Sequence, residues 1–296
     1  MKKTFRLVPL LLLLLLVQTA MAQISHGTVK EGIAFQSKIL NKNVRYTIYL
    51  PFDYATSERR YPVVYLLHGY TDNDTGWLQF GEANLIADQA IANMEIPPMI
   101  LVMPDGGVSW YINNHDGSVK YEDFFFKEFI PQIEQTWRIR AEKRYRGIAG
   151  LSMGGFGSLI YSLRHPEMFA ACAAFSSAIF TDEETIGFDE DRWKNIESIL
   201  YGPGLKGKDR LTEHYKSYNP LNLVRGGNPE KIKSVRLYLD CGDDDFLYKG
   251  NSTFHILLRD LKLPHEFRVR DGGHTWSYWR SGLVEGLKFI GTSFHQ

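Results

Sequence analysis

Ser152 is the residue of this sequence best placed to act as a nucleophile. It stands in the segment Gly150–Gly155 (Gly-Leu-Ser-Met-Gly-Gly), between an expected strand and an expected helix. This is the context of a nucleophile elbow, in which the serine occupies a strained turn and the glycines let the strand and helix backbones approach closely. The helix that begins at Met153 directs the positive end of its dipole toward the same place. The N–H of Met153 is therefore one expected donor to a developing oxyanion.

A serine hydroxyl needs a base within hydrogen-bond reach to attack at neutral pH. The chain has nine histidines, and His274 is the expected base because it stands in a glycine-bearing loop directly after the last expected strand. His68 also ends a strand and competes for the role, but it is interpreted more simply as shaping the loop that follows it. In that loop we expect the backbone N–H of Tyr70 to be the second oxyanion donor.

The acid that orients the histidine is expected between the serine and the histidine in the chain. The segment Asp240–Phe246 follows a strand and supplies four carboxylates. Asp240 belongs to the strand itself, and Asp243 and Asp244 fall in the turn, where a solvated role is expected. Asp245 is therefore favoured as the acid, and Asp243 is the alternative. So many acids also suggest a calcium loop, but the segment lacks the alternation and the distal glutamate of an EF-hand, and no metal is predicted.

Two tryptophans near these motifs are candidates to line a substrate pocket. Trp77 follows the expected oxyanion loop, and Trp276 lies shortly after His274. Buried tryptophans are more often part of a core, and that alternative stays open for both.

Short apolar runs alternate with helical patterns along most of the chain. The run Tyr61–Leu67 lacks polar alternation, which suits a strand buried on both faces. The repeated order of strand and helix predicts a doubly wound, mostly parallel α/β sheet. The expected strands are Val44–Leu50, Tyr61–Leu67, Met99–Met103, Tyr145–Ala149, Phe169–Phe175, Val235–Cys241 and Glu266–Arg270. The expected helices are Ala83–Asn93, Glu122–Trp137 with a kink at Pro131, Met153–Arg164, Ser252–Leu261 and Tyr278–Ile290.

The alternation stops between about residues 178 and 233, where acidic clusters are mixed with segments rich in glycine and proline. One helical pattern, Arg192–Leu200, occurs there, and no strong strand pattern does. We interpret this segment as a lid-like insertion over one edge of the sheet, within a single catalytic domain of residues 23–296.

The amino terminus has the features of a secretory signal peptide. Basic residues precede an apolar run over residues 7–17, and Ala20–Ala22 offers the small residues that a signal peptidase reads. We expect residues 1–22 to be removed before Gln23 and the product to be secreted or periplasmic. No membrane span is expected, since about 11 apolar residues fall short of the roughly 20 that cross a bilayer.

The composition argues against nucleic acid as a partner. The 296 residues include 34 Lys and Arg against 34 Asp and Glu, so there is no basic field to gather phosphates. Export permits a disulfide, but the two cysteines would be offset by several residues on neighbouring parallel strands, which is too far for a bridge. We therefore expect Cys172 and Cys241 to be buried free thiols.

Five motifs occur in order between about Val44 and Phe289, and together they resemble the esterase-D/feruloyl esterase family of α/β-hydrolases. The motifs are Leu66–Tyr70, Met103–Gly106, Gly150–Gly155, Cys241–Leu247 and Gly273–Trp276. The resemblance implies an α/β-hydrolase fold and a serine carboxylesterase that needs no cofactor. It also implies a triad of Ser152, His274 and Asp245, because the acid of that family follows a Gly-x-x sequence, and it matches Tyr70 to the second oxyanion donor of the family.

The resemblance covers several substrate classes. Expected export argues against a cytosolic formylglutathione hydrolase and favours an enzyme that removes feruloyl or related hydroxycinnamoyl groups from a plant polysaccharide or oligosaccharide such as xylan. Acetyl xylan esterase, siderophore esterase and acyltransferase are the alternatives on the same fold. The non-enzyme alternative is a glycan-binding protein on an inactive hydrolase scaffold, which the complete set of serine, acid and histidine disfavours. The acyl group, the sugar carrier and the oligomeric state do not follow from the sequence.

Overall fold

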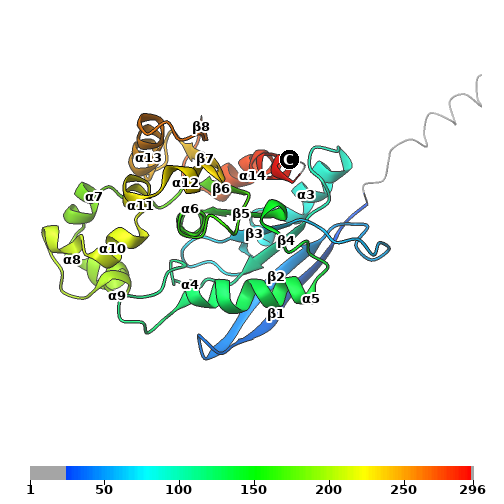
Figure 1. Cartoon of the computed structure of the whole chain (residues 1–296), viewed down its shortest axis with the longest axis horizontal. Helices are drawn as coiled ribbons and strands as arrows, with labels where there is room; N and C mark the ends of the chain where they lie inside the picture. Colours follow the sequence, from blue (N-terminus) through cyan, green and yellow to red (C-terminus); the bar gives the residue numbers. More distant parts are fainter. Residues whose placement is uncertain (1–24, 295–296) are drawn as a thin grey trace, which may run out of the picture.

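The computed structural model describes residues 25–294, which are built around one eight-stranded sheet (Figure 1). The strand order is β1-β2-β4-β3-β5-β6-β7-β8; β2 is antiparallel to β1 and β4, and the other neighbours are parallel. The expected mostly parallel α/β sheet is therefore confirmed. The strands are β1 (Thr28–Ser37), β2 (Lys42–Leu50), β3 (Val63–Leu67), β4 (Ile100–Pro104), β5 (Arg146–Leu151), β6 (Ala171–Phe175), β7 (Arg236–Gly242) and β8 (Glu266–Arg270).

Strand β1 is absent from the sequence-based prediction, in which the first strand begins at Val44. The pairing register of β1 shifts between Lys30 and Ile33, as in a β-bulge. Val29 packs against the core on one face of the sheet, whereas Phe35 packs against the core on the other. The bulge thus turns the apolar side chains from one face to the other, so no single two-residue period marks this strand.

Helices cover both faces of the sheet. Helices α3 and α14 pack on one face, and α6 and the α4–α5 segment pack on the other (Figure 1). Because both faces are covered, β3, β4, β5 and β6 are buried along their whole length. The helices are α2 (Gly76–Gln79), α3 (Ala83–Ala92), α4 (Tyr121–Phe124), η1 (Phe125–Phe129), α5 (Ile130–Thr136), η2 (Lys143–Tyr145), α6 (Met153–Arg164), α7 (Asp182–Gly187), α8 (Glu190–Arg192), η3 (Trp193–Glu197), α9 (Ser198–Tyr201), η4 (Gly207–Arg210), α10 (Glu213–Tyr218), α11 (Pro220–Gly226), α12 (Pro229–Lys233), α13 (Tyr248–Asp260) and α14 (Trp276–Ser293).

The helix expected over Glu122–Trp137, with a kink at Pro131, is divided into α4 and α5 by a π turn, η1, that ends shortly before Pro131. Proline has no N–H to donate to the carbonyl of Lys127, and its ring crowds that carbonyl. The wider π turn directly before Pro131 accommodates both effects.

The segment between β6 and β7 consists of the short helices α7 to α12, at the left of Figure 1. Several begin at a side-chain cap, as at Thr181, Thr212 and Asn219. The single helical pattern expected at Arg192–Leu200 corresponds to η3 and α9. The other helices were not expected, because one or two turns are too short to show a helical period.

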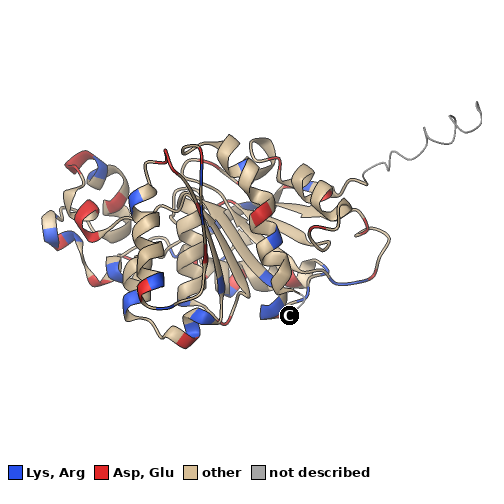
Figure 2. Cartoon of the chain, turned by 90° about the horizontal axis from the view of Figure 1, so that it is seen from above, with Lys and Arg blue, Asp and Glu red and all other residues tan. Residues whose placement is uncertain are grey.

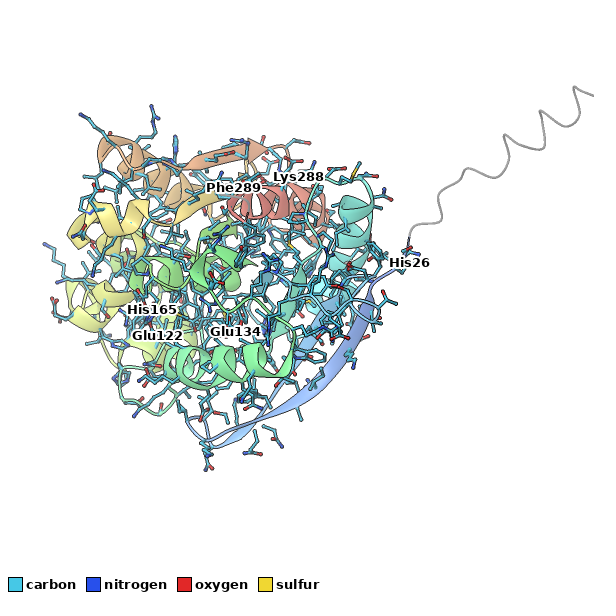
Figure 3. The ribbon with its side chains drawn as sticks, turned by 45° about the vertical axis from the view of Figure 1, so that its right-hand side comes forward. His26, Glu122, Glu134, His165, Lys288 and Phe289 are labelled. Carbon is cyan, nitrogen blue, oxygen red and sulfur yellow. The ribbon has the colours of Figure 1, made fainter. Side chains whose placement is uncertain are left out.

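A buried ionic cluster fastens this insertion to the rest of the fold. Glu122, at the start of α4, accepts hydrogen bonds from Arg164 Nε (2.8 Å), His165 Nε2 (2.8 Å) and Tyr218 Oη (2.6 Å). Glu122 and His165 lie near each other in Figure 3. Burial favours a raised pKa for Glu122, but these hydrogen bonds outweigh it and lower the pKa to about 2. Because Tyr218 belongs to α10, the cluster joins the insertion to α4 and α6.

Lys and Arg are interspersed with Asp and Glu over the helices in Figure 2, in agreement with the equal numbers of basic and acidic residues. Within residues 25–294, none of the helices combines the length and apolarity needed to cross a membrane. Cys172 pairs in register with Leu237 rather than with Cys241, and both thiols are free and buried, as expected. The expected signal peptide and its cleavage before Gln23 lie outside the described residues.

Candidate active site

Ser152 lies at the turn between β5 and α6, with φ of 54° and ψ of −118°. A positive φ is costly for a residue with a side chain, so its surroundings have to hold it. Its N–H donates to Phe175 O at 2.9 Å, and its carbonyl accepts from Ala178 N–H at 3.1 Å. A Cβ on Gly154 would lie 2.3 Å from Leu67 O, so only glycine fits where helix and strand meet. The strand, tight turn and helix expected around this serine are confirmed.

Three side chains from distant parts of the sequence form one hydrogen-bonded chain at the carboxyl edge of the sheet. His274 Nε2 lies 2.9 Å from Ser152 Oγ, and His274 Nδ1 lies 2.9 Å from Asp245 Oδ2 and 3.1 Å from Oδ1. Ser152 follows β5, Asp245 follows β7 and His274 follows β8. Parallel pairing aligns the ends of these strands. A carboxylate only accepts, so Nδ1 carries the proton and Nε2 is available to the serine hydroxyl.

Several donors hold Asp245 as a carboxylate. Burial favours a raised pKa, but hydrogen bonds from His274, Ser176 and the N–H of Leu247 (2.9 Å) lower the pKa of Asp245 below its ordinary value. Ser176 also accepts from Trp279 Nε1 at 2.9 Å. The sequence analysis missed Ser176 and Trp279. Ser176 directly follows β6, so its place at the same sheet edge is the signal that could have identified it.

The alternative acid, Asp243, is directed elsewhere. It is exposed, and its Oδ1 accepts from Gly272 N–H at 3.0 Å. Asp243, Asp244 and Asp271 form an exposed group whose carboxylate oxygens lie within 4.8 Å of one another. The structure therefore brings Asp245, not Asp243, to His274.

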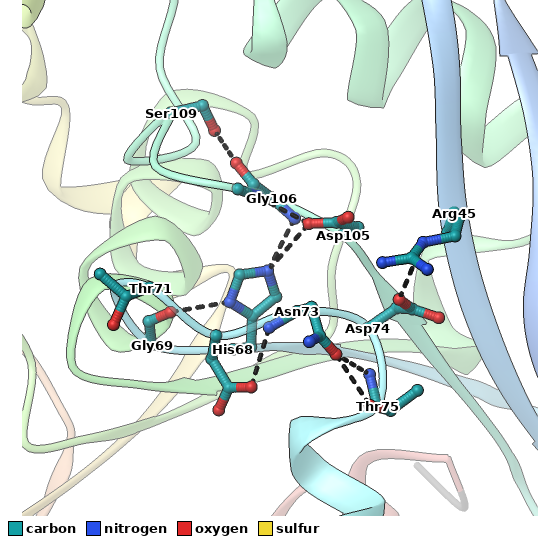
Figure 4. Close-up of polar contacts among 12 residues, drawn as sticks. Arg45, His68, Gly69, Thr71, Asn73, Asp74, Thr75, Asp105, Gly106 and Ser109 are labelled. Carbon is teal, nitrogen blue, oxygen red and sulfur yellow. Dashed lines mark hydrogen bonds and ion pairs between the residues drawn. The ribbon is translucent and has the colours of Figure 1, made fainter.

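His68 fastens the loop that carries Tyr70 (Figure 4). Its Nδ1 donates to Gly69 O at 2.7 Å, and its Nε2 accepts from Gly106 N–H at 2.7 Å. With both ring nitrogens bonded to backbone, His68 shapes this loop as expected and makes no bond to Ser152. A Cβ on Gly69 would lie 3.6 Å from Ser152 Cβ, so the loop runs beside the serine.

Both expected oxyanion donors belong to this neighbourhood. Tyr70 follows Gly69 in the fastened loop, and Met153 is the first residue of α6. Within residues 25–294, neither backbone N–H donates a hydrogen bond. Two amides beside the serine are thus available to an oxygen of a bound ester.

The two tryptophans differ in their surroundings. Trp77 is 1% exposed, and its Nε1 donates to Leu67 O at 2.9 Å. Its ring is enclosed in the core and its polar atom is already bonded, which favours the core alternative that the sequence left open for Trp77. Trp276 is partly exposed at the start of α14, with its ring 5.3 Å from that of Trp77 and 5.7 Å from that of the exposed Phe80. It stays a candidate for substrate contact.

Comparison with known proteins identifies the family. Residues 37–290 match the family described as "Esterase". The chain belongs to this esterase family. The resemblance to feruloyl esterases is confirmed, and the chain spans 23% and 55% of the lengths of the first two curated relatives that it matches.

Individual relatives agree with this assignment. The esterase is similar to a ferulic acid esterase of solved structure, with 33% identity and a TM-score of 0.78 over 91% of this chain and 100% of that one. It is 36% identical over 168 residues to an endo-1,4-beta-xylanase/feruloyl esterase of Xylanibacter ruminicola, covering 54% of this chain but only 23% of that protein. It is 27% identical to an acetyl esterase of Caldicellulosiruptor saccharolyticus over 87% of this chain and 96% of that protein.

Proposed function

We propose that this esterase is an exported serine enzyme that releases feruloyl or related hydroxycinnamoyl groups from plant cell-wall polysaccharides such as xylan. The observation that carries the proposal is the continuous hydrogen-bonded chain from Ser152 through His274 to Asp245. The similarity to a ferulic acid esterase supports the acyl group, and the expected signal peptide supports export.

The first half of the reaction acylates the serine. Ser152 Oγ attacks the ester carbonyl carbon while His274 Nε2 takes its proton, and Asp245 stabilises the imidazolium. The carbonyl oxygen becomes an oxyanion that accepts hydrogen bonds from the N–H groups of Tyr70 and Met153. When the intermediate collapses, the bond between the carbonyl carbon and the sugar oxygen breaks. His274 gives its proton to that oxygen, and the sugar alcohol departs.

The second half releases the acid. Water attacks the acyl-enzyme carbonyl as His274 removes one of its protons, and the same two N–H groups receive the oxyanion. Collapse breaks the bond to Ser152 Oγ, which regains its proton from His274. No cofactor takes part in these steps. In both halves His274 has to be neutral when it accepts the proton, because only the neutral imidazole can act as a base.

Acetyl esterase is the second candidate. It is favoured by the similarity to the Caldicellulosiruptor acetyl esterase, which the chain covers almost completely. The triad and the oxyanion donors serve both reactions equally, so the two candidates differ only in the acyl group.

Hydrolysis of methyl ferulate by the mature protein tests the proposal, with 4-nitrophenyl acetate measured in parallel and Ser152→Ala as the matched variant. Turnover of ferulate that the substitution abolishes supports both the nucleophile and the acyl class. Turnover of acetate alone assigns the esterase to the second candidate. Ester turnover that survives in Ser152→Ala contradicts the role of the serine.

A further inference from the structure

A row of neighbouring aromatic rings includes the histidine of the triad. The ring centroid of His274 lies 4.6 Å from that of Phe246 and 4.8 Å from that of Trp279. The ring of Trp279 lies 5.4 Å from that of Trp276, and the ring of Trp276 lies 5.7 Å from that of Phe80. This aromatic row therefore begins and ends at phenylalanines from two different loops, with the triad histidine within it.

Both ends of the aromatic row are exposed, whereas its middle is enclosed. Phe246 is 65% exposed and Phe80 is 50% exposed, and Trp276 beside Phe80 is partly exposed. Trp279 is buried, and the side chain of His274 is 19% exposed. A single exposed apolar side chain is ordinary in a folded protein. Several exposed aromatic rings beside a reactive group instead indicate a binding surface.

The turn between α2 and α3 is built to hold Phe80 against Trp276. A Cβ on Gly81 would lie 2.6 Å from a backbone carbonyl of α2 and 3.0 Å from the ring of Trp276, so glycine is needed for this close approach. Glu82 has a φ of 52°, and its Oε1 accepts a hydrogen bond from Arg280 of α14. Because such a backbone conformation persists only where contacts enforce it, the turn and α14 present the two rings together.

The reaction places the alcohol portion of an ester beside His274. His274 Nε2 gives its proton to the oxygen of the departing alcohol, so the two atoms have to come within about 3 Å of each other. The carbonyl oxygen is directed instead toward the N–H groups of Tyr70 and Met153. The alcohol is therefore the part of the ester that leads toward the rings around His274.

We infer that the exposed rings of Phe246, Trp276 and Phe80 form the binding surface for the sugar carrier of the ester. The inference rests on the proposed function, from which a carbohydrate as the alcohol is taken. Sugar rings have apolar faces made of C–H groups, and these faces pack on the electron-rich faces of aromatic rings. Exposed rings at both ends of the row suit a chain of several sugars, because a small alcohol such as methanol leaves them uncovered.

Two ferulate esters that differ only in the alcohol test the inference: the methyl ester, and the ester of an arabinose-substituted xylo-oligosaccharide. The measured quantity is the ratio of kcat/KM for the oligosaccharide ester to kcat/KM for the methyl ester. This ratio is expected to be about 10 or more in the wild type. Phe80→Ala, Trp276→Ala and Phe246→Ala are each expected to lower it about 3- to 10-fold, mainly through the KM of the oligosaccharide ester.

The ratio cancels a loss of folded protein and any effect of a substitution on His274, because both esters use the same base. Phe52→Ala is the matched control: Phe52 is 46% exposed and follows β2 at the opposite edge of the sheet, and the ratio should stay as in the wild type. A wild-type ratio near 1 overturns the inference. Unchanged ratios in Phe80→Ala, Trp276→Ala and Phe246→Ala overturn it as well.

Failure of the proposed acyl class is distinguished by acetyl esters. If wild-type protein hydrolyses 4-nitrophenyl acetate but neither ferulate ester, the feruloyl assignment fails. The ratio is then measured in the same variants for an acetylated xylo-oligosaccharide against methyl acetate. A fall of this ratio in Phe80→Ala, Trp276→Ala and Phe246→Ala but not in Phe52→Ala supports the sugar surface for an acetyl ester. The same ratio in all variants, or no hydrolysis of the acetylated oligosaccharide, overturns it.

Discussion

The catalytic edge of the sheet and the insertion between β6 and β7 are held in place by different kinds of polar contact. At the edge, Ser152, His274 and Asp245 are already hydrogen-bonded to one another. In the insertion, Tyr218 is bonded to Glu122 of α4, outside the insertion. The polar contacts at the edge join the groups of the triad to one another, whereas this contact fastens the insertion to the rest of the fold. We therefore expect changes at the edge to affect the turnover of every ester, and changes at the anchor of the insertion to affect stability.

The sharpest test of the catalytic edge compares two neighbouring aspartates. Asp245→Asn is expected to lower kcat about 10³- to 10⁴-fold for methyl ferulate and 4-nitrophenyl acetate alike, because the amide no longer stabilises the imidazolium. Asp243→Asn makes the same change at an exposed carboxylate that bonds only backbone and is expected to change kcat less than about 3-fold. A large loss of kcat in Asp243→Asn, or a loss of kcat for only one ester in Asp245→Asn, contradicts this assignment of the acid.

Glu122 of α4 is bonded to Tyr218 of the insertion between β6 and β7. A carboxyl with its pKa lowered from 4.5 to about 2 contributes roughly 3 kcal/mol of stability. The sign follows from the depressed pKa in the folded state: the contribution is present above about pH 4.5 and is lost as the pH falls toward 2. Glu122→Gln is therefore expected to lower the free energy of unfolding at pH 7. In this variant the free energy of unfolding should also fall less as the pH is lowered.

Urea denaturation at pH 7 and at several lower pH values measures this effect. Glu230→Gln is the matched control, because Glu230 is exposed on the same insertion and pairs only with Lys233; it is expected to change stability by less than about 0.5 kcal/mol. Equal effects of the two substitutions rule out the cluster as the anchor of the insertion.

Behind the triad, the hydrogen bond from Trp279 Nε1 to Ser176 Oγ positions the serine that bonds Asp245. Trp279→Phe leaves a smaller aromatic ring without the N–H donor, and it is expected to lower kcat about 10-fold with little change in KM. Ser176→Ala should have a similar effect, and the double variant should lose little more than either single one. Fully additive losses show that the two residues act independently.

The smallest expected effect concerns Glu197, which is buried in η3 of the insertion. Burial raises the pKa of Glu197 despite its contact with Arg192, so its ionised form destabilises the fold. Glu197→Gln is expected to stabilise the protein at pH 7 by less than about 1 kcal/mol. The gain should vanish in acid, where Glu197 itself is protonated. Thermal unfolding at both pH values measures it, and destabilisation by Glu197→Gln at pH 7 contradicts it.

The sequence predicted the parts of the site that follow local rules. The Gly-x-Ser-x-Gly segment predicted the turn at Ser152, because the close approach of strand and helix demands small residues there. His274 followed from its place after the last strand. The choice between Asp245 and Asp243 required the family resemblance, because both lie in one acidic turn and only the three-dimensional course of that turn decides which is buried beside the histidine.

Features that depend on contacts between distant segments were not predicted. Nothing in the local sequence distinguishes Trp77, which is enclosed in the core, from Trp276 at the surface, since residue type alone does not specify burial. A pocket lined by Trp110 and Asn114 of the β4–α4 loop and by Leu200 of α9 was not predicted either, because so short a helix shows no period. Strand β1 was missed because its bulge moves apolar side chains from one face of the sheet to the other.

The two thiols lie at different places in the same sheet, which makes them native reporters of its opening. Cys172 lies within β6, an interior strand of the sheet, and Cys241 lies near the end of β7 that leads to Asp245. Burial raises the pKa of each thiol to about 12, so neither reacts readily with a thiol reagent while it is enclosed. Labelling of Cys241 before Cys172 would measure a local opening of the catalytic edge, whereas simultaneous labelling would mean that this edge opens only when the whole sheet unfolds.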